Sequence, residues 1–290
     1  MRCAFRRHIP RTGAAGMFVA VLGAMLMPAA SQADEIIPSH CVALSQADPN
    51  LHYVALEDPI SASAIATGQV RLHYVGHATF VIETAAGLRI ATDYTGYAGG
   101  LEVPDIVTMN RAHTSHYTNN PDPRIPHVLR GWGSGPEDPA DHYVEEGDVV
   151  VRNVPTDIRS YGTREENGNS IFVFETAGLC IAHLGHLHHE PSDLQYALLG
   201  RMDVVMAPVD GGFTMSQPAM IRVLNRVKAR LVLPMHWFGL SNLERFLDGM
   251  SDEFEIRRGD GASVVMSLDD LPREPTVMVL MPASWPETGE

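Results

Sequence analysis

Short apolar runs separated by turn residues follow one another along the chain from residue 69 onwards. Each run is bounded by Gly, Asn, Asp or Pro, which is typical of β-strands. Strands are therefore predicted in VRLHYV, ATFVIET, LRIATDY, DIVTM, DVVVRNVP, SIFVFET, LCIAHLG, DVVMAPV, LVLPM, FEIRR, ASVVMSL and TVMVLM. The stretch 119–143 contains five prolines and three glycines and is predicted to be loop-rich.

Apolar residues at helical spacing enter in the second half of the chain. The segment SQPAMIRVLNRVKAR repeats them at Met220, Ile221, Leu224 and Val227. PSDLQYALLGRM begins with the Ser-Asp signature of a helix start, and SNLERFLDGM predicts a third helix. Many strands, followed by strands interleaved with helices, favour an α/β fold in which two sheets form a sandwich with helices outside.

The first 33 residues have the pattern of a secretory signal peptide. A basic, acid-free start precedes an uncharged apolar stretch at 14–30, and SQA stands before Asp34. The arginines of this start are Arg2, Arg6, Arg7 and Arg11. We expect cleavage after Ala33 and a periplasmic or secreted protein that has no stable membrane association afterwards. An uncleaved membrane anchor and a twin-arginine signal are the alternatives.

The remaining chain is strongly acidic. The whole sequence has 21 Lys and Arg against 35 Asp and Glu, and the signal peptide takes only basic residues away. No basic run follows it, which argues against nucleic acid as a partner. In residues 34–68 the apolar positions show no clear periodicity, and this segment is predicted to form an N-terminal arm packed on the domain that follows.

Two cysteines, Cys41 and Cys180, remain outside the signal peptide. An oxidising compartment permits a disulfide between them. Cys180 lies in an apolar run, however, so a buried free thiol is an equal alternative. Two cysteines do not support a thiolate metal site.

Histidines are concentrated in three segments, each of which follows a predicted strand. These segments are NRAHTSHYTN with His113 and His116, CIAHLGHLHH with four histidines, and LVLPMHWFG with His236. Imidazole is the commonest side-chain ligand of transition metals, and three strand-end loops can converge on one ion. Taken singly, each histidine is more often structural or at the surface.

The order of these motifs resembles the metallo-β-lactamase superfamily, and within it the ascorbate-6-phosphate-lactonase-like branch. The resemblance runs from VRLHYVGHATFVIET through IATDY, the His113 loop and IFVFETAGLCIAHLG to LVLPMHW, and covers about residues 69–281. It implies an αββα sandwich of two mixed β-sheets with outer helices, and a metal site at one edge between the sheets. Residues 69–290 are therefore assigned to a metallo-β-lactamase-like domain.

The metal-ligand motif departs from the pattern of that family. Its His-x-His-x-Asp-His loop is represented by Arg111, His113, Ser115 and His116, and the aspartate of its His-x-Gly-Asp motif is replaced by His186. After DVVVRNVP, Asp157 is nearest to the place where the family has a further histidine. We therefore expect an ion pair of Arg111 and Asp157 in place of one metal, and a site for a single ion.

The resemblance assigns roles to the remaining residues. His116, His186 and His236 are the expected ligands, with His113 as a fourth, and Asp93 in IATDY is expected to orient a ligand histidine. His77 in GHATF is expected beside the site as a further catalytic candidate. The alternatives to these site roles are that Asp93 only caps a turn and that His77 is a buried, hydrogen-bonded structural residue. His183 and His188 are expected to be structural or rim residues.

Three imidazole ligands and an open position are the arrangement of a catalytic zinc site. The expected cofactor is one divalent transition metal, with zinc favoured over iron and manganese. The expected function is an exported metal-dependent hydrolase that uses a metal-bound water on a small ester, lactone, amide or phosphoester. A non-catalytic metal- or ligand-binding protein and a mononuclear iron oxygenase are the alternatives. The partner is a small-molecule substrate, and the oligomeric state is not predicted.

Overall fold

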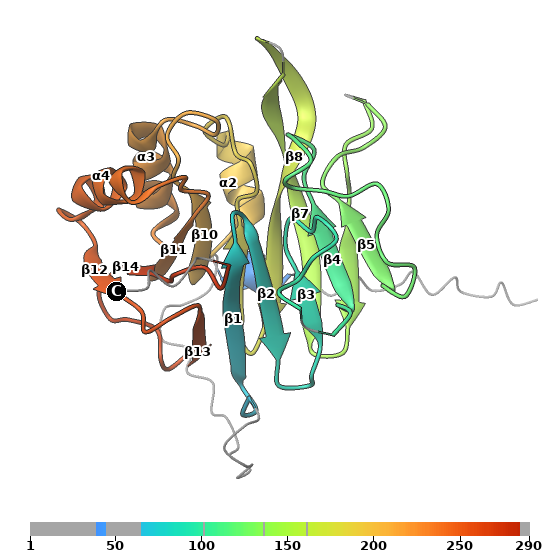
Figure 1. Cartoon of the computed structure of the whole chain (residues 1–290), viewed down its shortest axis with the longest axis horizontal. Coiled ribbons are helices and arrows are strands. Elements are labelled where there is room, and N and C mark those ends of the chain that lie inside the picture. The colour runs from blue at the N-terminus through green and yellow to red at the C-terminus, as the bar shows by residue number, and fades with distance from the viewer. Residues whose placement is uncertain (1–38, 45–64, 101, 136, 161, 285–290) are drawn as a thin grey trace, which may run out of the picture. The chain divides into compact units, whose positions relative to one another are not determined.

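Two mixed β-sheets make up the main part of the protein (Figure 1). The computed structural model describes residues 39–44, 65–100, 102–135, 137–160 and 162–284, which all belong to the compact unit Pro38–Glu290. The predicted signal peptide and most of the predicted arm, 34–68, lie outside the described residues. None of the described helices is long and apolar enough to span a membrane.

The first sheet has six strands in the order β13-β1-β2-β3-β4-β5. Their bounds are β1 Gln69–Gly76, β2 Thr79–Thr84, β3 Arg89–Ala91, β4 Ile106–Met109, β5 His127–Arg130 and β13 Ser263–Ser267. β5 lies in the stretch that the sequence predicts to be loop-rich, so that prediction is wrong at these residues. The four residues of β5 pair in parallel with β4, and this tertiary partner outweighs the flanking prolines and glycines.

The second sheet has eight strands in the order β12-β14-β11-β10-β9-β8-β7-β6. Their bounds are β6 Tyr143–Glu146, β7 Val149–Ser160, β8 Thr163–Thr176, β9 Leu179–His183, β10 Val204–Pro208, β11 Leu231–Met235, β12 Glu255–Arg258 and β14 Thr276–Val279. The central strands β9, β10 and β11 are buried at every residue, which explains their continuous apolar runs. β7 and β8 form a long hairpin whose far end extends beyond the neighbouring strands (Figure 1).

Four helices complete the described fold: α1 His40–Leu44, α2 Asp193–Leu199, α3 Gln217–Val227 and α4 Leu240–Met250. α2 begins at the N-cap Ser192, whose side chain and Gln195 form a capping box. α3 and α4 bury one apolar side each, including Leu224 and Phe246. Between β1 and β9 the described residues form strands and connecting loops but no helix. The predicted sandwich of two mixed sheets and the three predicted helices are confirmed.

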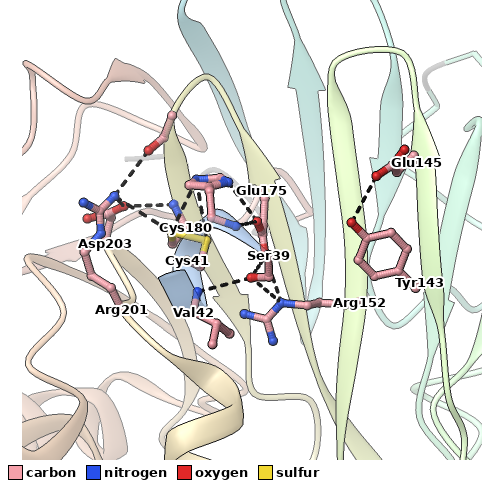
Figure 2. Close-up of polar contacts among 12 residues, drawn as sticks. Ser39, Cys41, Val42, Tyr143, Glu145, Arg152, Glu175, Cys180, Arg201 and Asp203 are labelled. Atoms are coloured by element: carbon pink, nitrogen blue, oxygen red, sulfur yellow. Dashed lines mark hydrogen bonds and ion pairs between the residues drawn. A yellow bond between two sulfur atoms is a disulfide. The ribbon is translucent and has the colours of Figure 1, made fainter. Parts of the chain in front are cut away.

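A disulfide and a buried ionic network attach α1 to the second sheet (Figure 2). Cys41 is bonded to Cys180 at the start of β9, so the bridge, not the free thiol, is present. Glu175 accepts hydrogen bonds from the backbone N–H of His40 (3.0 Å) and from Nε of Arg152 (2.8 Å). Burial alone would raise the pKa of Glu175, but hydrogen bonds from the side chains of His40, Ser39 and Arg152 outweigh it and hold the pKa at about 2.

Candidate metal centre

Turns at the ends of strands from both sheets bring the candidate residues together. His77 follows β1, Asp93 follows β3, and His236 follows β11. All three adopt a left-handed backbone conformation, with φ of 52°, 42° and 57°, which bends the chain sharply at the strand ends. The carbonyl oxygen of His77 accepts hydrogen bonds from the N–H of His236 and the hydroxyl of Tyr74, both at 2.8 Å. These bonds connect the turns of the two sheets.

Asp93 determines the orientation of the His116 ring. Both side chains are fully buried, and Nδ1 of His116 lies 2.6 Å from a carboxylate oxygen of Asp93. Asn110 donates to the other oxygen at 2.9 Å. Burial alone would raise the pKa of Asp93, but the charges of His116 and His183 and these hydrogen bonds keep the pKa below its usual value. The ionised carboxylate can only accept, so Nδ1 of His116 carries a hydrogen, and Nε2 is the ring nitrogen that remains for a proton or a metal ion.

Asp210, after β10, orients His236 in the same way. Nδ1 of His236 lies 3.1 Å from Asp210, and both side chains are buried. The carboxylate also accepts from the backbone N–H groups of Gly212 (2.8 Å) and Phe213 (2.5 Å). Burial would raise the pKa of Asp210, but the hydrogen bonds of His236, Thr214 and Gly212 lower it well below its usual value. This role of Asp210 was not predicted from the sequence, although Asp210 and Asp93 share one signal, an acidic residue two positions after a strand.

The two oriented rings face each other through their free nitrogens. Nε2 of His116 lies 3.2 Å from Nε2 of His236 in a fully buried environment. Since both Nδ1 atoms donate to carboxylates, the two Nε2 atoms can lie this close only with a proton or a cation between them. Two imidazoles on one tetrahedral zinc ion, with Zn–N of about 2.0–2.1 Å, have nitrogens about 3.3 Å apart. The observed pair therefore fits a metal ion.

His186 supplies a second observation that favours a metal. Its side chain is buried, and within the described residues neither ring nitrogen has a hydrogen-bond partner. Burial, followed by the charges of His116 and His236, lowers the pKa of His186 far below its usual value, so the ring is neutral. A buried neutral imidazole without a hydrogen bond is costly, and coordination to a cation compensates for this cost.

The histidines form two groups in which the ligand atoms lie within 4.8 Å of one another. One group consists of His77, His116 and His236, and the other of His113, His116 and His186. The predicted ligands are thus divided between two groups, and His77, predicted beside the site, completes one of them. Burial, and after it the charges of His236 and His116, lowers the pKa of His77 to about 3. The ligand roles themselves stay predictions.

Two further histidines of the second histidine segment, His183 and His188, make ordinary hydrogen bonds. Nε2 of His183 donates to the carbonyl oxygen of Ala78 at 2.8 Å, and Nδ1 of His188 accepts from the backbone N–H of Arg159 at 2.6 Å. These contacts agree with the structural role expected for both residues.

The expected ion pair between Arg111 and Asp157 is not formed. Arg111 pairs with Glu165 at 2.9 Å, whereas Asp157 accepts from Nε of Arg164 at 2.6 Å. Asp157 and Arg164 lie on β7 and β8, so they meet across the long hairpin. The prediction was wrong because sequence order did not show that this hairpin supplies partners of its own to both residues.

A pocket of about 410 Å³ borders this cluster on the side of His77. Its lining contains hydroxyl and apolar side chains together with His77, and no charged residue: Val75, Gly76, His77, Thr79, Thr95, Tyr97, Thr114, Ser115 and Ser284. The hydroxyl of Ser115 lies 3.1 Å from Nε2 of His77 and 3.0 Å from Nδ1 of His113. The pocket thus offers hydrogen bonds to a small polar molecule beside the histidines.

Replacing Asp93 with asparagine is expected to weaken metal binding by about 10- to 100-fold, because the amide removes the charge that orients His116 and raises its basicity. Competition of the purified protein with a chelator for Zn²⁺ measures this affinity. Asp105→Asn is the matched control, since Asp105 accepts from the backbone of Arg89 at the opposite end of the same sheet. Equal affinity of Asp93→Asn and the unmodified protein would contradict the role assigned to Asp93.

Comparison with known proteins identifies the family of this chain. A model of the β-lactamase superfamily domain matches residues 71–236. A UPF0173 metal-dependent hydrolase of Pyrococcus abyssi is 26% identical over 219 residues, which cover 68% of this chain and 96% of that protein. A second one, of Thermococcus onnurineus, is 24% identical over 68% of this chain and 96% of its own length.

Two solved structures share the fold. A metallo-β-lactamase superfamily protein from Thermotoga maritima superposes with a TM-score of 0.52 at 24% identity, over 73% of this chain and 98% of that one. Igni18, a metallo hydrolase from Ignicoccus hospitalis, gives a TM-score of 0.51 at 15% identity, over 69% of this chain and 99% of that one.

Proposed function

The chain belongs to the β-lactamase superfamily, and on this premise we propose that it is an exported metal-dependent hydrolase with a single metal ion. The facing Nε2 atoms of His116 and His236, 3.2 Å apart between two ionised carboxylates, carry the proposal. An ion held there supplies a Lewis acid that makes water nucleophilic near neutral pH and polarises the oxygen of the scissile bond. Zinc is favoured because a set of imidazole ligands suits it.

The hydrogen bonds of His116 support a single ion. This residue belongs to both histidine groups, but Asp93 occupies its Nδ1, so only Nε2 can bind an ion. The two groups therefore cannot both be completed at the same time. Both consist of histidines alone, and Ser115 and His186 stand where the related pattern has aspartates. Neutral side chains at these positions do not offset the repulsion between two divalent cations.

The protein's own residues position the reactants. Asp93 and Asp210 hold the rings of His116 and His236. The hydrogen bond from the N–H of His236 to the carbonyl oxygen of His77 holds the turns of the two sheets together. The hydroxyl of Ser115 and the neutral ring of His77 border the pocket and can hydrogen-bond to a substrate. Since the lining is uncharged, a small uncharged ester, lactone or amide suits it better than a phosphoester.

Export is supported by two features. The basic and then apolar N-terminus has the pattern of a signal peptide. The disulfide between Cys41 and Cys180 is of the kind that persists in oxidising compartments such as the periplasm.

Elemental analysis of the mature protein, purified without chelators or a histidine tag, tests the proposal together with a panel of esters and lactones. We expect about one equivalent of zinc per chain, and hydrolysis that a chelator abolishes and zinc restores. Two equivalents would overturn the single-ion assignment. One equivalent with no hydrolysis of any panel member would favour a binding protein, and aerobically bound iron with a coloured protein would favour an oxygenase.

A further inference from the structure

Two exposed phenylalanines lie directly beside the candidate metal centre. Phe213 and Phe238 are 65% and 56% exposed, and their ring centroids are 5.2 Å apart in an edge-to-face arrangement. The Phe238 ring is also 5.0 Å from the ring of His236 and 5.6 Å from that of His77. We refer to Phe213 and Phe238 as the aromatic platform.

The aromatic platform is held in place by the same contacts that build the site. Asp210 accepts from the backbone N–H of Phe213 at 2.5 Å while its carboxylate also orients His236. From the β7–β8 hairpin, the guanidinium of Arg159 donates to the carbonyl oxygens of Phe213 (3.2 Å) and Thr214 (2.5 Å). Phe238 follows His236 by two residues at the end of β11. The ring of Phe213 is therefore exposed on a backbone that is fixed by hydrogen bonds.

An exposed apolar surface beside a reaction centre can contribute binding energy when part of a ligand covers it. Aromatic rings are large apolar surfaces, and their exposure beside a site indicates a group that covers them when bound. A group that covers Phe238 also lies near the ring of His77, whose centroid is 5.6 Å from that of Phe238, and near the buried ring of His236, whose centroid is 5.0 Å away. This proximity to the proposed ion site argues for part of the substrate as the occupant.

His77 borders two chemically different surfaces. It lines the uncharged pocket, which carries hydroxyl groups, and its ring centroid also lies 5.6 Å from that of Phe238. A substrate lying across His77 would place a polar, uncharged part in the pocket and an apolar part on the aromatic platform. Building on the proposed function, we propose that Phe213 and Phe238 bind the acyl group of the substrate and select uncharged esters or amides of apolar acids.

A series of methyl esters of increasing acyl length tests the proposal: methyl acetate, butanoate and hexanoate, followed by pH-stat titration. We expect kcat/KM to rise about two- to fourfold per added methylene, as burial of each CH₂ on apolar rings requires. Phe238→Ala and the double variant Phe213→Ala/Phe238→Ala should flatten this dependence on chain length, whatever their absolute rates. Val265→Ala is the control, since Val265 is exposed and pairs with Arg71, remote from His77 along β1.

Binding of acetohydroxamic and hexanohydroxamic acid, measured by calorimetry, separates this proposal from the proposed function. If no ester is hydrolysed but the longer hydroxamate binds more tightly, and Phe238→Ala removes that difference, the hydrolase assignment fails and the aromatic platform stands. If esters are hydrolysed with no dependence on chain length, or with one that the double variant retains, the aromatic platform is overturned. Failure of both hydroxamates to bind overturns it as well.

Discussion

His116→Gln is expected to lower the affinity for zinc by more than about 100-fold and to abolish hydrolysis. Loss of a residue that only orients a ligand costs about 10- to 100-fold in affinity, and loss of the ligand itself costs more. His116 belongs to both histidine groups, so its replacement leaves neither group complete. His77→Gln and His186→Gln each leave one group of three histidines, and we expect a smaller loss from either.

Competition with a chelator measures these affinities, and the absorption spectrum of the Co²⁺-substituted protein reports the number of ligands. His127→Gln is the matched control, because His127 pairs with Glu146 at the surface and belongs to neither group. Since His116 is fully buried, the thermal unfolding of each metal-free variant should be recorded alongside. A folded His116→Gln protein that binds zinc as tightly as the unmodified protein would contradict the assigned site.

Removal of the disulfide is expected to have the largest effect on stability. Cys41 and Cys180 are 139 residues apart, and a bridge that closes a loop of this length restricts the unfolded chain strongly. For Cys41→Ala/Cys180→Ala we expect the free energy of unfolding to fall by about 3–5 kcal/mol. The loss would release α1 from β9 and deprive Glu175 of its contacts with the first residues of the described structure.

Denaturant unfolding of the metal-free protein measures this effect without a contribution from bound metal. A reducing agent should shift the unfolding midpoint of the unmodified protein towards that of the double variant and leave the variant itself unchanged. Zinc stoichiometry should stay the same, because Cys180 begins β9 whereas His186 follows its other end. Equal midpoints for the oxidised protein and the variant would show that the bridge does not stabilise the fold.

The elements of the fold could be predicted because their signals are local. Short apolar runs bounded by turn residues indicated the strands of both sheets except β5 and β6, and helix-start signals and helical spacing indicated the helices α2, α3 and α4. β5 escaped prediction because its four residues lie among prolines and glycines and depend on pairing with β4. The partners of Arg111 and Asp157 were predicted wrongly because the register of the β7–β8 hairpin supplies Glu165 and Arg164 instead.

By itself, the sequence determined which strand ends carry histidines and acidic residues, because side-chain chemistry and strand boundaries are properties of short segments. Only the tertiary structure decided which of them meet. Packing of two sheets and the left-handed turns at His77, Asp93 and His236 set the distances between segments far apart in the chain. Those distances assign Asp93 to His116 and Asp210 to His236, and so determine which ring nitrogens face each other. Because a metal site depends on the positions of lone pairs, the arrangement of its ligands emerged only in the folded protein.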